Sequence, residues 1–339
     1  MNVKILAKTL AIGDYNMEAK DLFQKQSRFL VTGCAGFIGS HLVETLLEAN
    51  HIVIGLDDLS NGFEANIKPF LDHANFTFIK GDIRDYQTCL NVTKNMDYVL
   101  HQAAWGSVPR SIEMPRLYEE INVQGTLNIF EASRHNRVKR VVYASSSSVY
   151  GDSTILPKKE GQEGSVLSPY ALTKQMNEAY GKLYTTLYGL ETIGLRYFNV
   201  FGPRQNPNGA YAAVIPKFTH LILKGEAPTI YGDGTQSRDF TYIKNVIEAN
   251  LKACVAPKES TGKAYNIACG ESIVLTKVFE VIKEALNQSH LEALYTNPRQ
   301  GDIKHSHADL EEARTHLNYH PKYSFYQGIR DYLSTLQIP

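Results

Sequence analysis

The stretch VTGCAGFIG at residues 31–39 decides the fold class, because it joins an apolar run to a segment with helical periodicity. Its three glycines recur every third residue. Glycines at this spacing allow a tight turn, let the backbone approach a pyrophosphate, and bring a helix close to a strand. The phosphates would lie at the helix N-terminus, where free N–H groups and the helix dipole favour negative charge. The residues predicted to contact a dinucleotide here are Gly33, Gly36, Phe37, Ile38 and Gly39.

Short apolar runs alternate with helix-periodic segments on the C-terminal side of this turn. Almost continuously apolar strands that are joined by helices are typical of a parallel sheet covered by helices on both faces. The sequence therefore predicts an α/β fold with a doubly wound parallel sheet, the Rossmann type. The expected strands lie at 28–33, 51–57, 76–82, 98–103, 140–146, 192–198 and 264–268, and the expected helices at 40–50, 118–136 and 169–189.

The domain organisation follows from changes in texture along the 339 residues. A short amphipathic segment at 17–26 predicts a helical N-terminal extension over 1–26. The dinucleotide-binding domain is expected over 27–200, with a return of the chain at about 236–268. Beyond residue 200, proline, glycine and polar loops interrupt the alternation. We expect a smaller C-terminal lobe that binds substrate, formed by 201–235 and 269–339.

Composition narrows the possible partners and location. Lys and Arg together number 35 and Asp and Glu together number 35, so the formal net charge is zero. A chain without a basic excess is not expected to bind nucleic acid or an anionic membrane. No signal peptide or long apolar run is visible, which favours a cytoplasmic protein. His305 and His307 have no further ligand cluster nearby in the sequence, so no metal site is expected.

An acidic residue at the end of the second expected strand indicates which dinucleotide binds. Asp57 lies 18 residues after Gly39, close to the spacing at which a carboxylate accepts hydrogen bonds from the adenosine ribose. The same charge would repel a 2′-phosphate, so NAD is expected rather than NADP. The competing interpretation is that Asp57 caps a turn. Asp82 and Ile83, which end the third expected strand, are weaker candidates for contact with adenine.

Tyr170 and Lys174 lie four residues apart on one face of an expected helix. A nearby ammonium and an oxidised nicotinamide would both favour the phenolate, so the tyrosine pKa is expected to fall towards neutrality. Such a tyrosine can act as a base towards an alcohol or sugar hydroxyl. The serine run at 145–148 ends the fifth expected strand, at the sheet edge where doubly wound folds bind ligands.

These motifs together resemble the extended short-chain dehydrogenase/reductases, from about residue 27 to the C-terminus. The resemblance rests on TGxxGxxG, Asp57, HQAA (101–104), SSSSVYG (145–151) and YxxxK in this order. RYFNVFGPRQ (196–205) and GDGTQSRDF (232–240) are typical of the family's nucleotide-sugar enzymes. HQAA-x-GSVPRS, the serine-rich strand and the N-terminal extension are similar to UDP-N-acetylglucosamine/UDP-N-acetylgalactosamine 4-epimerases of bacterial surface-polysaccharide pathways.

The resemblance implies roles for residues at matching motif positions. Ser146 would be the catalytic hydroxyl, Tyr170 the base, and Lys174 both its tuner and a ligand of the nicotinamide ribose. Tyr197 and Phe198 would flank the nicotinamide. The remaining cofactor contacts would be Asn61, Gln102, Ala103 and Ala104. The substrate contacts would be Ser107, Ser146, Ser147, Asn199, Ala213, Val214, Tyr231, Arg238, Arg299, Asp302 and Ser306, with the two arginines on the diphosphate.

The reaction implied by the resemblance is C4 epimerisation through a 4-keto sugar, with NAD as a retained catalyst. Tyr170 would take the proton of the 4-hydroxyl while C4 gives hydride to NAD, and hydride would return to the other face after the sugar turns. Ser306 would face the C2 substituent, where similar enzymes restricted to non-acetylated hexoses have a tyrosine. UDP-N-acetylhexosamines are therefore the expected substrates. A homodimer through helices at 115–135 and 169–188 is also expected by resemblance.

Three alternatives remain open at this point. A 4,6-dehydratase would need acidic groups after the catalytic hydroxyl, where this chain has Ser147 and Ser148. A UDP-glucose/UDP-galactose 4-epimerase, or a UDP-glucuronate epimerase or decarboxylase, is compatible with the same motifs. A non-catalytic NAD sensor could use the same fold, but such a protein has no need of the Tyr170 and Lys174 pair.

Overall fold

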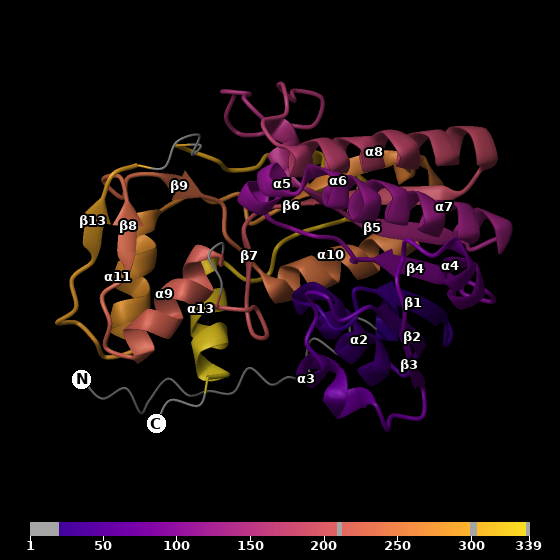
Figure 1. Cartoon of the computed structure of the whole chain (residues 1–339), viewed down its shortest axis with the longest axis horizontal. Helices are drawn as coiled ribbons and strands as arrows, with labels where there is room; N and C mark the ends of the chain where they lie inside the picture. The colour runs from indigo at the N-terminus through magenta and orange to yellow at the C-terminus, as the bar shows by residue number, and fades with distance from the viewer. Residues whose placement is uncertain (1–19, 209–211, 299–303, 337–339) are drawn as a thin grey trace.

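A seven-stranded parallel sheet forms the core of the larger part of the molecule, toward the right of Figure 1. The computed structural model describes residues 20–208, 212–298 and 304–336. The strand order is β3-β2-β1-β4-β5-β6-β11, and every neighbouring pair is parallel. This confirms the predicted doubly wound fold. The strands are β1 (Arg28–Thr32), β2 (Ile52–Asp57), β3 (Phe76–Lys80), β4 (Tyr98–His101), β5 (Arg140–Ser146), β6 (Glu191–Tyr197) and β11 (Lys263–Ile267).

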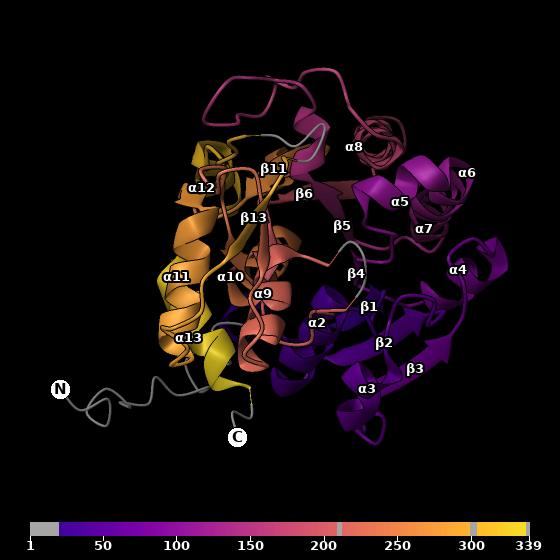
Figure 2. The same ribbon diagram turned by 60° about the vertical axis from the view of Figure 1, so that its left-hand side comes forward.

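Helices cover both faces of this sheet (Figure 2). On one face α2 (Phe37–Glu48) packs against α10 (Ile243–Val255). On the other face lie α4 (Tyr86–Val92), α7 (Gly125–His135) and α8 (Pro169–Tyr188). Successive side chains of a strand point to opposite faces, so each strand contributes to two cores. In β1, Phe29 and Val31 join one buried cluster and Leu30 joins the other.

The helix expected over 118–136 is interrupted in the structure. It begins as α6 (Pro115–Tyr118), passes through a π-helical turn at Glu119–Gln124, and continues as α7. A π turn inserts an extra residue into a helix and is frequent at functional sites. Here the turn contains the buried Asn122, whose amide is hydrogen-bonded to both backbone groups of Trp105. The helix periodicity of the sequence does not reveal this interruption.

The long helix α8 has clear signals at both ends. The Ser168 hydroxyl accepts a hydrogen bond from the Ala171 N–H, and Pro169 occupies the first helical position, where no N–H partner is needed. Gly189 ends the helix in the left-handed region, with φ of 70°. These local signals explain why the expected and observed bounds of this helix agree closely.

Much of the chain after residue 200, apart from α10 and β11, forms a smaller lobe beside the sheet, at the left of Figure 1. Pairs of short strands link its segments: β7 with β10, β9 with β12, and β8 with β13. Its strands are β7 (Val200–Phe201), β8 (Thr229–Tyr231), β9 (Ser237–Arg238), β10 (Thr241–Tyr242), β12 (Ile273–Val274) and β13 (Leu294–Thr296). Its helices are α9 (Val214–Leu223), α11 (Leu275–Ala285) and α13 (Phe325–Ser334). The helix α12 (Glu311–Leu317) packs against β11 and α10 at the sheet edge, and the short helices α3 (Glu64–Ile67) and α5 (Val108–Glu113) lie in the first half.

Most of the predicted N-terminal extension lies outside the described residues. Within them, Lys20–Leu22 is helical and Phe23 packs edge-on against Phe29 and Tyr98. The end of the extension is thus anchored on the first strand. Across the described part of the chain, none of the helices is long and apolar enough to cross a membrane.

Candidate active site

A cleft with a volume of about 370 Å³ opens at the carboxyl ends of β1, β2 and β4. β1 pairs with β2 on one side and with β4 on the other, so the cleft lies where the strand order reverses. Doubly wound sheets bind nucleotides at this switch point. The structure brings together here twelve predicted cofactor residues: Gly33, Gly36, Phe37, Ile38, Gly39, Asp57, Asn61, Asp82, Ile83, Gln102, Ala103 and Ala104.

The glycine turn is shaped by close backbone contacts. Gly33 has φ of +67°, and a Cβ atom added there would lie 2.8 Å from the backbone nitrogen of Ala103. A Cβ atom added at Gly39 would lie 2.0 Å from the Gly33 carbonyl oxygen, so only glycine fits. Gly36 forms the N-cap of α2, and no side chain caps this helix end. The free N–H groups at the start of α2 therefore face the cleft and suit a pyrophosphate.

The Asp57 carboxylate combines both roles considered for it. It is buried and lines the cleft, and its oxygens accept hydrogen bonds from the N–H groups of Ala35 at 2.9 Å and Leu59 at 2.8 Å. Burial raises the pKa of Asp57, while the two N–H groups oppose this rise. Asp57 thus caps the turn and also presents a carboxylate where a ribose is expected.

The candidate catalytic residues meet at the carboxyl end of β5. Ser146 is the last residue of this strand, and its hydroxyl accepts a hydrogen bond from the Ser148 N–H at 3.1 Å. A hydrogen bond from the Ser146 side chain reaches the phenol of Tyr170, in the first turn of α8. One turn later, Lys174 is only 3% exposed and its Nζ donates to the Ala144 carbonyl at 2.8 Å. The three predicted catalytic residues are therefore in one place.

The electrostatic prediction for Tyr170 requires correction. Burial raises the pKa of the phenol, and the Ser146 hydrogen bond only partly opposes this rise. Burial also lowers the pKa of Lys174 to about 8. Removal of water penalises the charged form of both groups, so the chain's own residues do not produce the lowered phenol pKa expected from the sequence. The sequence analysis also expected a positively charged nicotinamide to favour the phenolate, and this part of the expectation depends on the bound cofactor.

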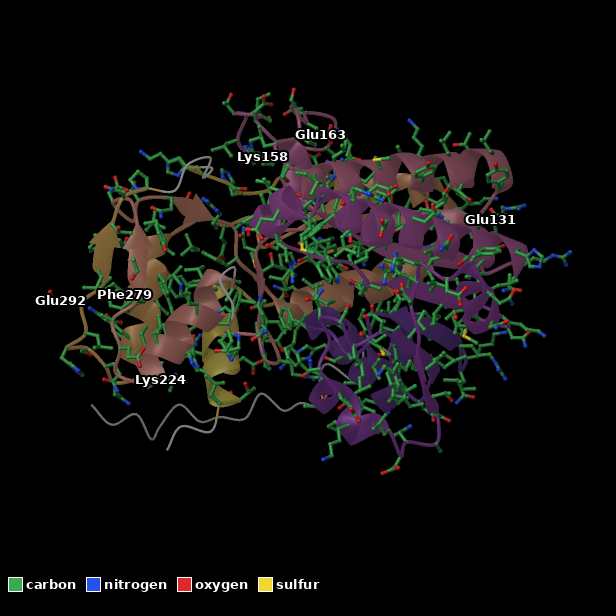
Figure 3. The ribbon with its side chains drawn as sticks, in the orientation of Figure 1. Glu131, Lys158, Glu163, Lys224, Phe279 and Glu292 are labelled. Atoms are coloured by element: carbon green, nitrogen blue, oxygen red, sulfur yellow. The ribbon has the colours of Figure 1, made fainter. Side chains whose placement is uncertain are left out.

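A buried ion pair behind these residues was missed by the sequence analysis. Glu178 accepts hydrogen bonds from the Ser145 hydroxyl at 2.5 Å and from the Arg196 guanidinium at 2.8 Å, and its charge raises the pKa of Lys174. Arg196 also pairs with Glu163, which lies with Lys158 on the loop before α8 (Figure 3). The available signal was the spacing: Glu178 follows Lys174 by one helical turn.

Tyr197, the last residue of β6, and Phe198, which follows it, lie in different environments. The Tyr197 hydroxyl donates to Gln102 Oε1 at 3.0 Å and accepts from Asn250 Nδ2 at 2.9 Å, so it is tied to the floor of the cofactor cleft. Phe198 is 0% exposed and packs in the core near Tyr150. The expectation that Phe198 flanks the nicotinamide is therefore wrong, because no part of its ring is open to a ligand.

A second cleft, of about 250 Å³, lies in the lobe, beyond the carboxyl end of β6. It is lined by five of the predicted substrate residues: Asn199, Ala213, Val214, Tyr231 and Arg238. The start of α9 and the strand β9 form its walls. Apolar neighbours such as Phe218 and Phe240 complete a pocket with an arginine at one side. This combination suits a flat base together with an anion.

The other predicted substrate residues that the structure describes do not line the walls of these clefts. Ser107 caps α5, and Ser147 begins the 3₁₀ turn after Ser146. The Ser306 N–H donates to the Ser237 carbonyl at 3.1 Å, which holds Ser306 beside the strand of Arg238. Arg299 and Asp302 lie outside the described residues. His305, set aside as a metal ligand, shares a hydrogen bond of 2.9 Å with the Ser237 hydroxyl.

The sheet places the catalytic residues between the two clefts. β5 lies between β4, whose continuation lines the first cleft, and β6, whose continuation lines the second. Ser146 ends β5, so the reacting group of a ligand in the second cleft can meet a cofactor in the first. The arrangement suits redox chemistry at a carbon that bears a hydroxyl group.

Comparisons with known proteins agree with this arrangement. Residues 29–268 match the model of the NAD dependent epimerase/dehydratase family. A putative UDP-glucose 4-epimerase of Methanocaldococcus jannaschii is 41% identical over 303 residues, which cover 89% of this chain and 95% of that protein. A UDP-glucuronate 4-epimerase of Thermodesulfobacterium geofontis is 32% identical, with 89% and 94% covered.

Two solved structures are also similar. The UDP-N-acetylglucosamine 4-epimerase of Methanobrevibacter ruminantium, in complex with UDP-N-acetylmuramic acid, has a TM-score of 0.86 and 39% identity, with 92% of this chain and 100% of that chain covered. The UDP-glucose 4-epimerase of Thermus thermophilus, in complex with NAD, has a TM-score of 0.80 and 34% identity, with 91% and 98% covered.

Proposed function

This chain belongs to the NAD dependent epimerase/dehydratase family, and we propose that it interconverts UDP-N-acetylglucosamine and UDP-N-acetylgalactosamine by epimerisation at C4. At the coarser level it is an NAD-using UDP-sugar 4-epimerase, which is an isomerase. The observation that carries the proposal is the position of Ser146, Tyr170 and Lys174 between a dinucleotide cleft and a second cleft that contains Arg238.

The residues of the first cleft fit NAD. The free start of α2 suits the pyrophosphate, and Asp57 presents its carboxylate to the adenosine ribose. Lys174 and Tyr197 would hold the nicotinamide end, since one is at the catalytic helix and the other is tied to Gln102. When bound there, NAD supplies the reversible oxidation of a sugar carbon.

The protein's own part in the reaction is to move one proton and to orient the sugar. The Tyr170 phenolate would take the proton of the sugar 4-hydroxyl and become the neutral phenol, and the Ser146 hydroxyl would hydrogen-bond the same oxygen. Of the chain's own groups, the Ser146 hydrogen bond favours the phenolate form, and burial opposes it. Arg238 would anchor the diphosphate with charge-assisted hydrogen bonds. An anchor on the diphosphate leaves the hexose free to present either face.

The preference for N-acetylated sugars rests on Ser306. This small side chain is held beside Arg238 through the backbone hydrogen bond to Ser237, so it is close to the expected diphosphate and sugar. A serine leaves space for an N-acetyl group at C2 and can hydrogen-bond it. A small residue admits the larger sugar but does not strongly reject the smaller one. Weak activity on UDP-glucose and UDP-galactose is therefore part of the proposal.

The names of the relatives keep two other substrates under consideration, UDP-glucose and UDP-glucuronate. A 4,6-dehydratase is disfavoured because Ser147 and Ser148 follow Ser146, where that reaction would need acidic groups. The deciding experiment measures kcat/KM for UDP-N-acetylglucosamine, UDP-N-acetylgalactosamine, UDP-glucose, UDP-galactose and UDP-glucuronate, with products identified by NMR. A higher kcat/KM on either non-acetylated hexose or on UDP-glucuronate would overturn the proposed substrate.

We also propose that the enzyme is a cytoplasmic homodimer that serves the synthesis of a surface polysaccharide. The support for the dimer is an apolar strip on α8, where Leu183, Leu187 and Tyr188 are exposed, with Leu187 at 64%. Large apolar side chains gathered on one helix are a common mark of a protein interface. Light scattering at several protein concentrations, for the parent and for Leu187→Glu, would test the oligomeric state.

A further inference from the structure

Trp105, the single tryptophan of the chain, lies at the mouth of the cofactor cleft. It follows directly after Gln102, Ala103 and Ala104, which form the floor of that cleft. Across the mouth are Ser60 and Asn61, on the loop that follows β2. The cleft is thus bordered by two loops that are separated by more than forty residues in the sequence.

Contacts join these two loops directly. The Trp105 Nε1–H donates to the Ser60 hydroxyl at 3.4 Å, and the Arg110 Nη1–H donates to Asn61 Oδ1 at 3.3 Å. The Arg110 guanidinium stacks over the indole ring, with its carbon 4.4 Å from the ring centroid. The two crossing hydrogen bonds are long and therefore weak. Such contacts can open to admit a ligand and close behind it.

The same pair also contacts the catalytic side. Trp105 packs edge-on against the buried Tyr118 at 6.0 Å, and Tyr118 packs edge-on against Tyr170 at 6.3 Å. Arg110 Nε donates to the Tyr118 hydroxyl at 3.4 Å. The backbone of Trp105 is fixed by the Asn122 amide, at 2.8 and 3.1 Å. A rigid backbone with an adaptable side chain is what a gate over a cleft requires.

We propose that Trp105 and Arg110 form a clasp that closes over the bound NAD and slows its dissociation. The clasp acts on the cofactor, so the proposal is the same whichever UDP-sugar is the substrate. Its benefit rests on the proposed function, because an epimerase returns the cofactor to its starting state in every cycle. Loss of the reduced cofactor between the two half-reactions would leave the keto sugar unable to be reduced.

The test uses the purified holoenzyme and measures the rate at which NAD dissociates. Arg110→Met keeps the apolar stem but removes the guanidinium, and we expect NAD to dissociate about tenfold faster, equivalent to about 1.4 kcal/mol. Arg116→Met is the matched control, since Arg116 is 94% exposed and its side chain pairs only with Glu120, at 3.9 Å, among the ion pairs of the described residues. This control should release NAD at the parent rate. Circular dichroism and thermal melting would verify that both variants fold.

A second measurement uses the tryptophan itself. Because the chain has one tryptophan, its fluorescence reports on the cleft mouth alone. Addition of NADH to cofactor-stripped protein should quench this emission through energy transfer to the reduced nicotinamide. Trp105→Leu should dissociate NAD at least as fast as Arg110→Met, with unchanged folding. Parent-like dissociation in both variants would overturn the clasp, as would a tryptophan emission that does not respond to NADH. A parent protein that binds no NAD would overturn the cofactor assignment as well.

Discussion

The Nζ atom of Lys174 lies 5.9 Å from the centroid of the Tyr170 ring. Both side chains are withdrawn from water, so burial raises the pKa of the phenol and lowers that of the ammonium to about 8. Burial thus favours the neutral form of each group. A charge brought beside them in this water-poor site would shift both pKa values strongly. The consequences for catalysis can be measured one residue at a time.

Replacement of Tyr170 by phenylalanine should remove the base and little else. We expect kcat to fall by at least about a hundredfold, because general base catalysis of this kind contributes about 10²- to 10⁴-fold. The free energy of unfolding should fall by only about 1 kcal/mol, the typical value of one hydrogen bond. Turnover assays and urea unfolding would check both values, with NAD content as the control. Parent-like turnover would remove Tyr170 from its role.

The resident dinucleotide should be NAD, because the Asp57 carboxylate repels a 2′-phosphate. Mass spectrometry of the nucleotide released on denaturation measures this directly. Asp57→Ala should lose the preference and also destabilise the fold by about 1–3 kcal/mol, since the N–H groups of Ala35 and Leu59 lose their acceptor. Asp58→Ala is the control, because among the described residues that exposed neighbour accepts a hydrogen bond from the Ser60 N–H alone. Recovery of mainly NADP from the parent would contradict the role of Asp57.

Substrate choice should respond to the size of residue 306. Ser306→Tyr should lower kcat/KM for both N-acetylated sugars by at least about tenfold, and leave UDP-glucose and UDP-galactose nearly unchanged, because a bulky side chain excludes only the larger sugar. Ser306→Ala keeps the space and serves as the control, with a small loss on the N-acetylated sugars. An unchanged ratio between the two classes in Ser306→Tyr would show that this residue does not select the substrate.

Stability should depend on pH through Asp239, next to Arg238. Its 0% exposed carboxylate accepts hydrogen bonds from the N–H groups of Cys269, Gly270 and Ala308, and burial raises its pKa from 3.8 to about 6. The folded state therefore holds this proton more tightly than the unfolded state does. The stabilisation of the folded state by this proton is fully present below the ordinary pKa of 3.8 and is lost as the pH rises through about 6. The free energy of unfolding should fall by about 3 kcal/mol in total over this range.

The comparison is with Asp239→Asn, which cannot titrate at this position. The variant loses hydrogen bonds at every pH, so its free energy of unfolding is lowered by an amount that does not depend on pH. The difference in unfolding free energy between parent and variant, measured in urea from about pH 4 to about pH 7, should shift against the parent as the pH rises. A difference that is independent of pH would show that the carboxylate keeps its ordinary pKa in the folded protein.

Local patterns in the sequence determined the sheet, the glycine turn and the ends of α8. These features depend on residues within a few positions of one another: the apolar runs, the three glycines of 31–39, and Ser168 before Pro169. The Tyr170 and Lys174 pair belongs with them, since one helical turn places both on the same face. Physical constraints that act over one turn or one strand can be read from sequence order alone.

Tertiary structure decided what depends on distant segments and on the loss of water. The Trp105 side chain is hydrogen-bonded to Ser60, and Ser306 lies beside Arg238. Phe198 is buried in the core. No local sequence pattern requires any of these contacts. The rise of the Tyr170 pKa has the same origin, because desolvation adds up over every atom around the phenol. The sequence by itself determined which groups are present and on which elements they lie. Their exposure and their partners across the cleft follow from packing, which joins residues from the whole chain.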